Sequence, residues 1–513
     1  MMDHLETAPD QSARILELWA GFVPGKRIGS LVDGAILEGT GAALELIDPT
    51  NGTAFANFND AGDAVVDAAM ASATLAQRAW AAMTASARGR VLYEIGRLVR
   101  QNAEAIAELE CRAAGRPIRD MRGEAQRVAE MFEYYAGWCD KLHGEVIPVP
   151  SSHLNYTRRE PLGVVTQITP WNAPLFTGGW QIAPAIAAGN GVVIKPSELT
   201  PLSTIILGIL CEKAGAPRGL VNVLAGQGST TGAAAVGHAA TALVVFVGSS
   251  GGGMAVAEAA ARNLIPCILE LGGKSANIVF PDADLDRAVL GAQSAIFGGA
   301  GQSCVAGSRL LVHRSVHAQF VERYAQAAGR IPFGHPAEPM TQIGPINNRR
   351  QFEKIDAMVA RGVSEGARLA GGGRAGGALG QSGGFFYAPT ILDGVLPQME
   401  IAREEVFGPV VAVMTFETEE EAVALANATP YGLAGAVWTQ NVARAHRVAA
   451  GVRAGTFWIN GYKTINVMSP FGGFGKSGYG RSSGLEAMHA YTQPKSVWVE
   501  TAENPPVAFG YSG

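Results

Sequence analysis

The sequence predicts an α/β protein with two large domains, each built around a mostly parallel sheet. Its 513 residues are too many for one hydrophobic core, since single cores stop growing at about 250 to 300 residues. From Gly163 onward, short β-branched runs alternate with helical stretches, and a second alternation begins after Gly272. Strands that alternate with helices pair in parallel, so we expect a Rossmann-type sheet followed by a second α/β unit.

The elements follow from local patterns. Residues 62–110 and 120–142 are rich in alanine and repeat apolar residues every three or four positions, which predicts helices. The strands expected in the first sheet are residues 163–168, 191–194, 220–224, 243–246 and 267–271. Those expected in the second are 275–280, 309–313, 410–416 and 456–460.

Three further segments lie outside these sheets. Residues 153–159 and 496–500 alternate like exposed edge strands, which are suited to pairing with another subunit. Residues 369–385 are so rich in glycine that we expect a flexible surface loop without chemistry.

Composition excludes several classes of function. The chain is 48% hydrophobic and 17% charged with a net charge of −5. It contains no dense Lys/Arg cluster, so we expect no nucleic-acid partner. The N-terminus lacks a basic start followed by an apolar run, and glycine, proline or asparagine interrupts the apolar stretches, so we expect a cytoplasmic protein without a membrane span. Five scattered cysteines and nine histidines form no C-x-x-C and no metal-binding motif, which predicts a reducing compartment and no metal.

Cys304 is the strongest candidate for catalysis. It lies in the glycine-lined segment F-G-G-A-G-Q-S-C, and Glu270 in L-E-L-G-G-K offers a carboxylate. A thiol and a carboxylate that meet in space suit acyl transfer through a thioester. Taken singly, each residue is equally typical of an inert buried thiol or a paired carboxylate.

Asn172 is the candidate oxyanion donor. It lies between two prolines in T-P-W-N-A-P, after the first strand of the first sheet, where its amide could face a developing oxyanion. An isolated asparagine at such a place is more often a turn residue.

Several turns suggest a dinucleotide site. F-V-G-S-S-G-G-G follows a strand and opens a helix expected from Met254, which places backbone N–H groups where a pyrophosphate could bind. Lys195 and Glu198 in K-P-S-E end another strand, where they could hold a ribose. Glu405 and Phe407 in E-E-V-F-G-P could hold a ribose and a nicotinamide ring. Each is also consistent with a plain solvated turn, and the glycine run 226–232, with Gly228, is one residue too long for the usual fingerprint.

Seven motifs occur together in a characteristic order: T-P-W-N-A-P-L, K-P-S-E, F-V-G-S, L-E-L-G-G-K, G-Q-S-C, E-E-V-F-G-P and S-P-F-G-G-F. By their order and spacing the chain resembles the aldehyde dehydrogenase superfamily over roughly residues 40–500. The resemblance implies an aldehyde dehydrogenase-like fold: an NAD-binding domain (1–140 and 161–271), a catalytic domain (272–480) and a small β oligomerisation element (141–160 and 483–505). It also implies a homodimer or homotetramer that acts on a small-molecule aldehyde.

The resemblance assigns roles to the motif residues. Cys304 is expected to be the nucleophile, Glu270 the general base, and Asn172 with the Cys304 backbone N–H the oxyanion hole. The cofactor site is expected to comprise Trp171, Lys195, Glu198, Gly228, Gly248, Ser249, Glu405 and Phe407. Because a carboxylate at the ribose repels a 2′-phosphate, Glu198 predicts NAD rather than NADP.

The chain departs from many relatives at two pairs of positions. Gln181 and Ser482 are neutral where many relatives carry lysine and glutamate, which leaves the proton route from Glu270 open. Ala173 and Ile465 replace aromatic rings beside the aldehyde, whereas Trp180, Val305 and Phe471 stay apolar, so a roomier pocket for bulky or aromatic aldehydes is expected. Refilling of that space by neighbouring side chains is an equal alternative, and Lys463 near the entrance is either solvated or selective for an anionic aldehyde.

Three other functions compete. A CoA-acylating dehydrogenase would exclude water, which the retained Glu270 disfavours. A non-catalytic member of the fold would not need Cys304, Glu270 and Asn172 together. A cysteine hydrolase would need a histidine partner, and no histidine lies in a recognisable partner motif.

Overall fold

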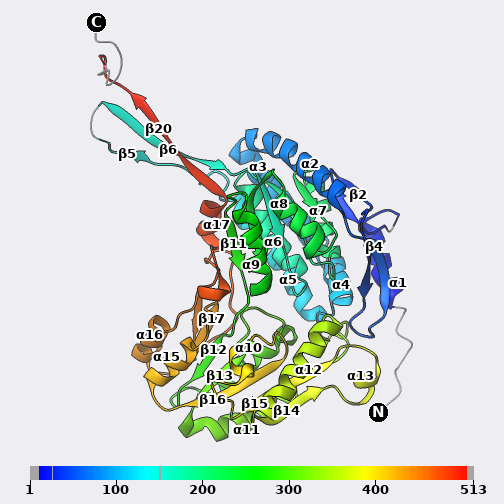
Figure 1. Cartoon of the computed structure of the whole chain (residues 1–513), viewed down its shortest axis with the longest axis vertical. Coiled ribbons are helices and arrows are strands. Elements are labelled where there is room, and N and C mark those ends of the chain that lie inside the picture. Colours follow the sequence, from blue (N-terminus) through cyan, green and yellow to red (C-terminus); the bar gives the residue numbers. More distant parts are fainter. Residues whose placement is uncertain (1–10, 26, 150–151, 505–513) are drawn as a thin grey trace.

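Helices surround two large sheets, and a small projecting sheet and a two-stranded hairpin complete the molecule (Figure 1), so the predicted α/β class is confirmed. The computed structural model describes residues 11–25, 27–149 and 152–504. Residues 1–10 and 26 of the predicted first domain, and 150, 151 and 505 of the predicted small element, lie outside the described residues.

The first sheet has eight strands in the order β19-β11-β10-β7-β8-β9-β1-β2. Their bounds are β1 (Ser30–Val32), β2 (Ala35–Leu37), β7 (Val164–Ile168), β8 (Gly191–Lys195), β9 (Val221–Val223), β10 (Thr241–Val247), β11 (Cys267–Glu270) and β19 (Gly478–Tyr479). The five predicted strands are β7 to β11 and pair in parallel, as expected. Every residue of β7 and β8 is buried, because helices cover both faces of a parallel sheet.

Short antiparallel strands extend both edges of this sheet and escaped prediction. β1 and β2 form a hairpin next to β9, and β19 pairs with β11 although it follows the second sheet in the sequence. Strands of two or three residues are too short for an alternating pattern to reveal them. The β11–β19 pair matters for the site, since it places Gly478 opposite Glu270.

The second sheet has seven strands in the order β14-β15-β16-β13-β12-β17-β18. Their bounds are β12 (Ala276–Val279), β13 (Arg309–His313), β14 (Arg368–Arg374), β15 (Tyr387–Asp393), β16 (Val410–Phe416), β17 (Ala434–Trp438) and β18 (Thr456–Ile459). The four predicted strands are present as β12, β13, β16 and β18.

The predicted loop over residues 369–385 is wrong in part. β14 pairs antiparallel with β15, and helix α13 (Gly377–Gln381) follows it. The ladder shifts register on both sides of Gly371, and Gly372 and Gly373 have positive φ. Backbone hydrogen bonds to an edge strand therefore order a segment whose glycines carry no pattern of side chains.

The helices cover the two sheets. They are α1 (Gln11–Phe22), α2 (Asp63–Ala82), α3 (Ala85–Gln101), α4 (Ala103–Ala114), α5 (Ile118–Ala136), α6 (Pro174–Ala187), α7 (Leu202–Lys213), α8 (Ala233–Gly237), α9 (Ser250–Ala261), α10 (Leu285–Phe297), α11 (His317–Ala328), α12 (Arg349–Ser364), α14 (Glu400–Arg403), α15 (Glu419–Asn427), α16 (Val442–Gly451) and α17 (Gly484–Ala490). The region predicted as helix over 62–110 is thus three helices. Thr84 interrupts it by capping α3, where its side chain accepts a hydrogen bond from the Ala87 N–H, and Asn102 ends α3. No helix of the described residues is long and apolar enough to cross a bilayer.

The third sheet projects from the body of the molecule (Figure 1). It consists of β5 (Val146–Ile147), β6 (His153–Pro161) and β20 (Thr492–Glu500), in the order β20-β6-β5. Both predicted edge strands fall in it, and they pair with each other along their whole length. A separate hairpin, β3 (Ala43–Ile47) and β4 (Ala54–Asn59), lies near the N-terminus.

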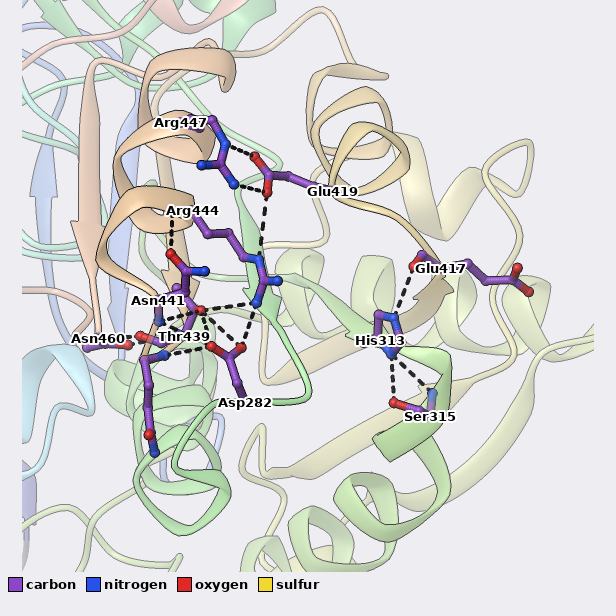
Figure 2. A network of polar contacts seen from close by, with 11 residues as sticks. Asp282, His313, Ser315, Glu417, Glu419, Thr439, Asn441, Arg444, Arg447 and Asn460 are labelled. Carbon is purple, nitrogen blue, oxygen red and sulfur yellow. Dashed lines mark hydrogen bonds and ion pairs between the residues drawn. The ribbon is translucent and has the colours of Figure 1, made fainter.

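A polar network closes the carboxyl edge of the second sheet (Figure 2). Asp282, which follows β12, accepts hydrogen bonds from the Thr439 hydroxyl at 2.8 Å and from Arg444 at 2.9 Å. It also accepts the backbone N–H groups of Gln440 and Asn441 at the start of α16. Asn460, which follows β18, accepts the Thr439 N–H at 3.0 Å. The loops after three neighbouring strands are therefore held together, and the sheet's amino edge is left to face the first sheet.

Candidate active site

One large cavity lies between the two sheets. The carboxyl ends of β7, β10 and β11 supply one side, and the segments that precede β13 and β16 supply the other. The cavity encloses about 1150 Å³, part of it open to solvent. The predicted site residues that line it are Trp171, Asn172, Ala173, Trp180, Gly248, Ser249, Glu270, Cys304, Val305, Glu405, Phe407, Ile465 and Phe471.

Cys304 lies on a tight turn at the edge of the cavity. Gly299, Ala300 and Gly301 before it have positive φ. A Cβ on Gly301 would lie 1.9 Å from the Gly408 carbonyl oxygen, so only glycine allows this approach. Burial raises the pKa of the Cys304 thiol to about 12, and the Glu270 and Glu405 carboxylates act in the same direction. In the resting protein Cys304 is therefore a thiol at neutral pH.

Asn172 is held beside Cys304 by one of its two amide hydrogens. Its Nδ2 donates to the Gln302 carbonyl at 2.8 Å, within the cysteine turn. The second N–H remains available to a ligand in the cavity. Helix α6 begins two residues later, and its Leu175 N–H donates to the buried Glu110 carboxylate at 3.1 Å.

Glu270 ends strand β11 and is almost fully buried. The Ser482 hydroxyl donates to its Oε1, and the Trp180 indole N–H donates to that hydroxyl at 2.8 Å. Burial raises the pKa of Glu270 to about 8, against the opposing effects of the Ser482 hydrogen bond and the positive charge of Arg481. A carboxyl with this pKa titrates close to neutral pH, which suits a general base.

Gln181 belongs to a different group of hydrogen bonds. Its Oε1 accepts the Tyr491 hydroxyl at 3.0 Å, and its backbone carbonyl accepts Nε2 of Gln167 at 2.8 Å. Of the two neutral replacements noted in the sequence, Ser482 is the one that contacts Glu270.

Aromatic and aliphatic side chains form the wall of the cavity near Cys304. Phe176 stacks on Trp180 with ring centroids 5.1 Å apart, and Phe471 meets Trp180 edge-on at 6.0 Å. Ala173, Val305 and Ile465 complete this wall. Lys463 does not line it: its Nζ donates to the Gly298 carbonyl at 3.0 Å, and burial lowers its pKa to about 8.

Gly248 and Ser249 form the turn between β10 and α9. The Gly248 N–H donates to the Glu270 carbonyl at 3.0 Å. A Cβ on Gly248 would lie 2.7 Å from the Phe246 ring. Ser249 caps α9 by accepting the Gly252 N–H at 3.2 Å. The helix begins at Ser250 rather than at the predicted Met254, because this serine cap starts it earlier.

The three residues Lys195, Glu198 and Gly228 do not line the cavity. They lie close to the turn that begins at Gly226. The buried Lys195 ammonium donates to the Gly226 carbonyl at 2.9 Å and lies 3.4 Å from Glu198. Gly228 begins a short π-helix, and Asp60 holds this turn by accepting the Gln227 N–H at 2.8 Å. Burial lowers the pKa of Lys195.

Glu405 and Phe407 face the cavity from the second sheet. Glu405 accepts the Gly273 N–H at 3.1 Å, and burial raises its pKa. Phe407 has a φ of 59° and meets Trp171 edge-on with centroids 5.3 Å apart. Gln351 and Lys354 of α12 hold this segment through its backbone carbonyls.

Sequence reasoning missed several residues that build the site. Gln302, Gln351 and Lys354 act through backbone carbonyls, and Glu110 acts through the start of α6. Gln302 belongs to the G-Q-S-C motif, so its place beside Cys304 in the sequence could have identified it. The other three lie in ordinary helical patterns, which carry no signal of a long-range contact.

The comparisons with known proteins agree with this geometry. The model of the aldehyde dehydrogenase family matches residues 36–497. Retinal dehydrogenase 2 of Homo sapiens is 42% identical over 466 residues, which cover 90% of this chain and 89% of the relative. Betaine aldehyde dehydrogenase of Bacillus subtilis (strain 168) is 42% identical over 460 residues, with 89% and 94% covered. The structure of betaine aldehyde dehydrogenase from Staphylococcus aureus in complex with NAD+ superimposes with a TM-score of 0.93 at 35% identity, covering 98% of this chain and all of that chain.

Proposed function

The chain belongs to the aldehyde dehydrogenase family, and from this premise we propose that it oxidises an aldehyde to the carboxylic acid with NAD, through a thioester on Cys304. The observation that carries the proposal is that Cys304, Asn172 and Glu270 line one cavity. A nucleophile, an oxyanion donor and a base of near-neutral pKa are the groups that this chemistry needs.

The first step is attack of the Cys304 sulfur on the aldehyde carbon. The thiol proton must leave, because its raised pKa keeps sulfur protonated at rest. We assign its acceptance to Glu270, whose Oε2 has no hydrogen-bond partner among the described residues. The free N–H of Asn172 then stabilises the oxyanion of the thiohemiacetal, since an unpaired alkoxide in a buried site is costly.

The second step returns the enzyme to its free form. Oxidation of the thiohemiacetal leaves an acyl group on Cys304. Glu270 first releases the thiol proton to water in the cavity, and then takes a proton from the water molecule whose oxygen attacks the thioester carbon. The C–S bond breaks, the Cys304 sulfur takes up that proton, and the carboxylic acid leaves. The position of Glu270 in the same cavity supports this hydrolytic route over acyl transfer to CoA.

The residues present fit NAD. The turn at Gly248 and Ser249 starts α9, whose N–H groups before Gly252 are suited to a pyrophosphate, and Glu198 has a partly exposed carboxylate beside Lys195. Glu405, Phe407 and Trp171 are suited to the nicotinamide end. When bound, NAD supplies the two-electron acceptor for the thiohemiacetal. NAD-bound relatives of this fold support the assignment.

We propose that NAD is preferred over NADP because of Glu198. Its carboxylate accepts hydrogen bonds from free ribose hydroxyls and repels a 2′-phosphate. We expect at least about fivefold higher kcat/KM with NAD, since one like-charge contact is worth on the order of 1 kcal/mol or more. The matched variant Glu198→Gln should narrow the ratio, and equal kcat/KM for wild type with both cofactors would contradict the assignment.

For the substrate, we propose a bulky apolar or aromatic aldehyde. Ala173 and Ile465 leave space against the stacked Phe176 and Trp180 rings. Ala173→Phe should lower kcat/KM for benzaldehyde by about tenfold or more and spare acetaldehyde, since filling a pocket rejects the larger substrate. Wild-type enzyme that handles both aldehydes equally well would contradict the enlarged pocket.

We propose assembly as a homodimer or homotetramer through the projecting sheet. Leu154 and Val499 form an exposed cross-strand pair, and Val146 and Trp498 are also exposed. Exposed apolar residues on an extended sheet mark an interface. Leu154→Asp should lower the mass measured by analytical ultracentrifugation, and a wild-type monomer would contradict the proposal. A cytoplasmic location is proposed with it, since the five cysteines are free thiols.

The test of the reaction is NADH absorbance with NAD and a panel of short, long, aromatic and terpenoid aldehydes, without CoA. Cys304→Ala should lose at least about a thousandfold in rate, as nucleophile removal does in other enzymes. Cys267→Ala is the matched control, because Cys267 begins β11 but does not line the cavity. NADH formation that requires CoA, or that survives in Cys304→Ala, would contradict the proposal.

A further inference from the structure

Ser482 lies where three parts of the site meet. Strand β19 brings the chain back beside β11, with Gly478 opposite Glu270, and four residues later Ser482 is fully buried. Its N–H donates to the Phe471 carbonyl at 3.0 Å. Its hydroxyl contacts both Trp180 and Glu270. Ser482 therefore links the proposed general base, Glu270, to Trp180 and Phe471, two residues of the cavity wall near Cys304.

The direction of the hydrogen bonds around Ser482 is fixed by chemistry. An indole N–H can only donate, so the Ser482 oxygen accepts from Trp180. An ionised Glu270 can only accept, so the single hydroxyl hydrogen then points to its Oε1. A donor oriented in this way stabilises the ionised carboxylate more than the protonated acid.

The Trp180 ring is itself immobilised. Phe176 stacks on one side of it, and Phe471 contacts it edge-on. The indole N–H has a partner in Ser482, without which it would be a buried donor with no acceptor. The packed Trp180 ring thus orients the Ser482 hydroxyl, and this hydroxyl donates its hydrogen to Glu270.

We propose that Ser482 is a positioning residue that, aimed by Trp180, holds the Glu270 carboxylate at the cavity wall and favours its ionised form. This inference rests on the proposed function, in which Glu270 is the base. The donor chain does not carry protons out of the site. The hydroxyl oxygen already accepts from Trp180, and its hydrogen is committed to Glu270.

The groups around Glu270 determine how much the Ser482 hydrogen bond changes the pKa of Glu270. Burial raises the Glu270 pKa, and the Ser482 hydrogen bond is the larger of the two effects that lower it, followed by Arg481. The other titratable groups that interact with Glu270 are Cys304 and Tyr491. Both are neutral at pH 7, because burial raises their pKa values. Without the Ser482 hydroxyl, the pKa of Glu270 should rise by about one unit, the usual worth of one hydrogen bond to a charged group.

The test is an infrared titration of the full chain without ligand. The carbonyl band of protonated Glu270 is assigned by its absence in Glu270→Gln, and its intensity is followed from pH 5 to pH 10. We expect the wild-type midpoint near pH 8. Ser482→Ala should move it up by about one pH unit, and Ser482→Thr, which keeps the hydroxyl, should restore it. Trp180→Phe should move it in the same direction by less, because the hydroxyl is then no longer aimed.

Ser483 supplies the matched control. It is also fully buried, and its hydroxyl donates to the Ser469 carbonyl at 2.6 Å rather than to Glu270. Ser483→Ala should leave the midpoint unchanged. A Ser482→Ala midpoint equal to wild type, or an equal shift in Ser483→Ala, overturns the proposal. If Ser482→Ala does not fold, Ser482→Cys, a weaker donor, is expected to shift the midpoint upward, and no shift there is equally contrary.

The titration needs no turnover, so it separates the two claims. Absence of NADH formation by wild type would reject the proposed function and leave the infrared midpoints to judge Ser482. In an active enzyme, the acid limb of kcat should move with the midpoint in Ser482→Ala and stay in Ser483→Ala.

Discussion

Glu270 and Asp282 are carboxylates near the ends of buried parallel strands, yet their surroundings differ sharply. Asp282 accepts hydrogen bonds from a hydroxyl, two backbone N–H groups and an arginine. Although burial opposes ionisation there, the Thr439 hydrogen bond and the Arg444 charge lower the Asp282 pKa on balance. Glu270 accepts one hydrogen bond from Ser482, and burial raises its pKa to about 8.

The difference shows how one fold makes a structural carboxylate and a carboxylate suited to the base that we propose. Asp282 uses its acceptor capacity on the connection between β17 and α16 and stays ionised, so it has nothing to offer a ligand (Figure 2). Within the part of the chain that the structure describes, one oxygen of Glu270 has no hydrogen-bond partner, and the pKa of this cavity-lining carboxyl lies near neutral pH. Burial and the number of donors together separate the two roles: Glu270 is buried with one donor, whereas the Asp282 side chain is 34% exposed and has four.

The largest difference in activity is expected when each of the two carboxylates is neutralised in turn. Glu270→Gln is expected to lower steady-state turnover by about a hundredfold to ten-thousandfold, because the base for thioester hydrolysis is lost. Asp282→Asn, the matched change in the network, should leave kcat within about twofold. Stopped-flow NADH absorbance measures both. If the two variants lost equal activity, the distinction between the carboxylates would fail.

The same Glu270→Gln variant should also change Cys304. The Glu270 charge contributes to the raised pKa of the thiol. Its loss should therefore lower the thiol pKa and speed alkylation by iodoacetamide above pH 8, where the ionised base otherwise opposes the thiolate. Asp282→Asn should alkylate at the wild-type rate.

Asn172→Ala should cost about a hundredfold to a thousandfold in kcat, the usual effect of removing one oxyanion donor. The matched variant is Asn460→Ala in the Asp282 network, where the asparagine accepts the Thr439 N–H at 3.0 Å. It should leave kcat unchanged. Comparable losses in both would mean that Asn172 acts through folding rather than on the oxyanion.

The pH dependence of turnover should follow Glu270 and ignore Asp282. A base works when ionised, and the ionised fraction rises as pH passes upward through the folded pKa of about 8. Where hydrolysis limits the rate, kcat should therefore rise about tenfold from pH 7 to pH 9. Steady-state rates in a constant-ionic-strength buffer measure it. A flat profile over this range would indicate that Glu270 is already ionised at pH 7, or that another step limits the rate.

The sequence predicted the parts of this comparison unequally. The central strands and Cys304, Glu270 and Asn172 were accessible because long apolar runs and multi-residue motifs are local in sequence. The Ser482 contact was not, since it depends on strand β19 returning to the first sheet after the second sheet is complete. The Asp282 network was equally hidden: its members come from loops more than a hundred residues apart, and none stands in a motif. β14 escaped because a backbone ladder, not a side-chain pattern, orders its glycines.

Asp282→Ala is expected to have the smallest effect on activity and a clear effect on the free energy of unfolding. The change leaves the Gln440 and Asn441 N–H groups, the Thr439 hydroxyl and Arg444 without their acceptor, at the start of α16. The loss should be about 1–3 kcal/mol, the usual worth of hydrogen bonds to a charged group, since water replaces part of them at this partly exposed position. A lower urea midpoint of the variant would report it. Asp286→Ala is the control, because Asp286 is 85% exposed in its pair with Arg323 and such surface pairs contribute little. If Asp286→Ala moved the midpoint as far as Asp282→Ala, the donors around Asp282 would not be what makes it structural.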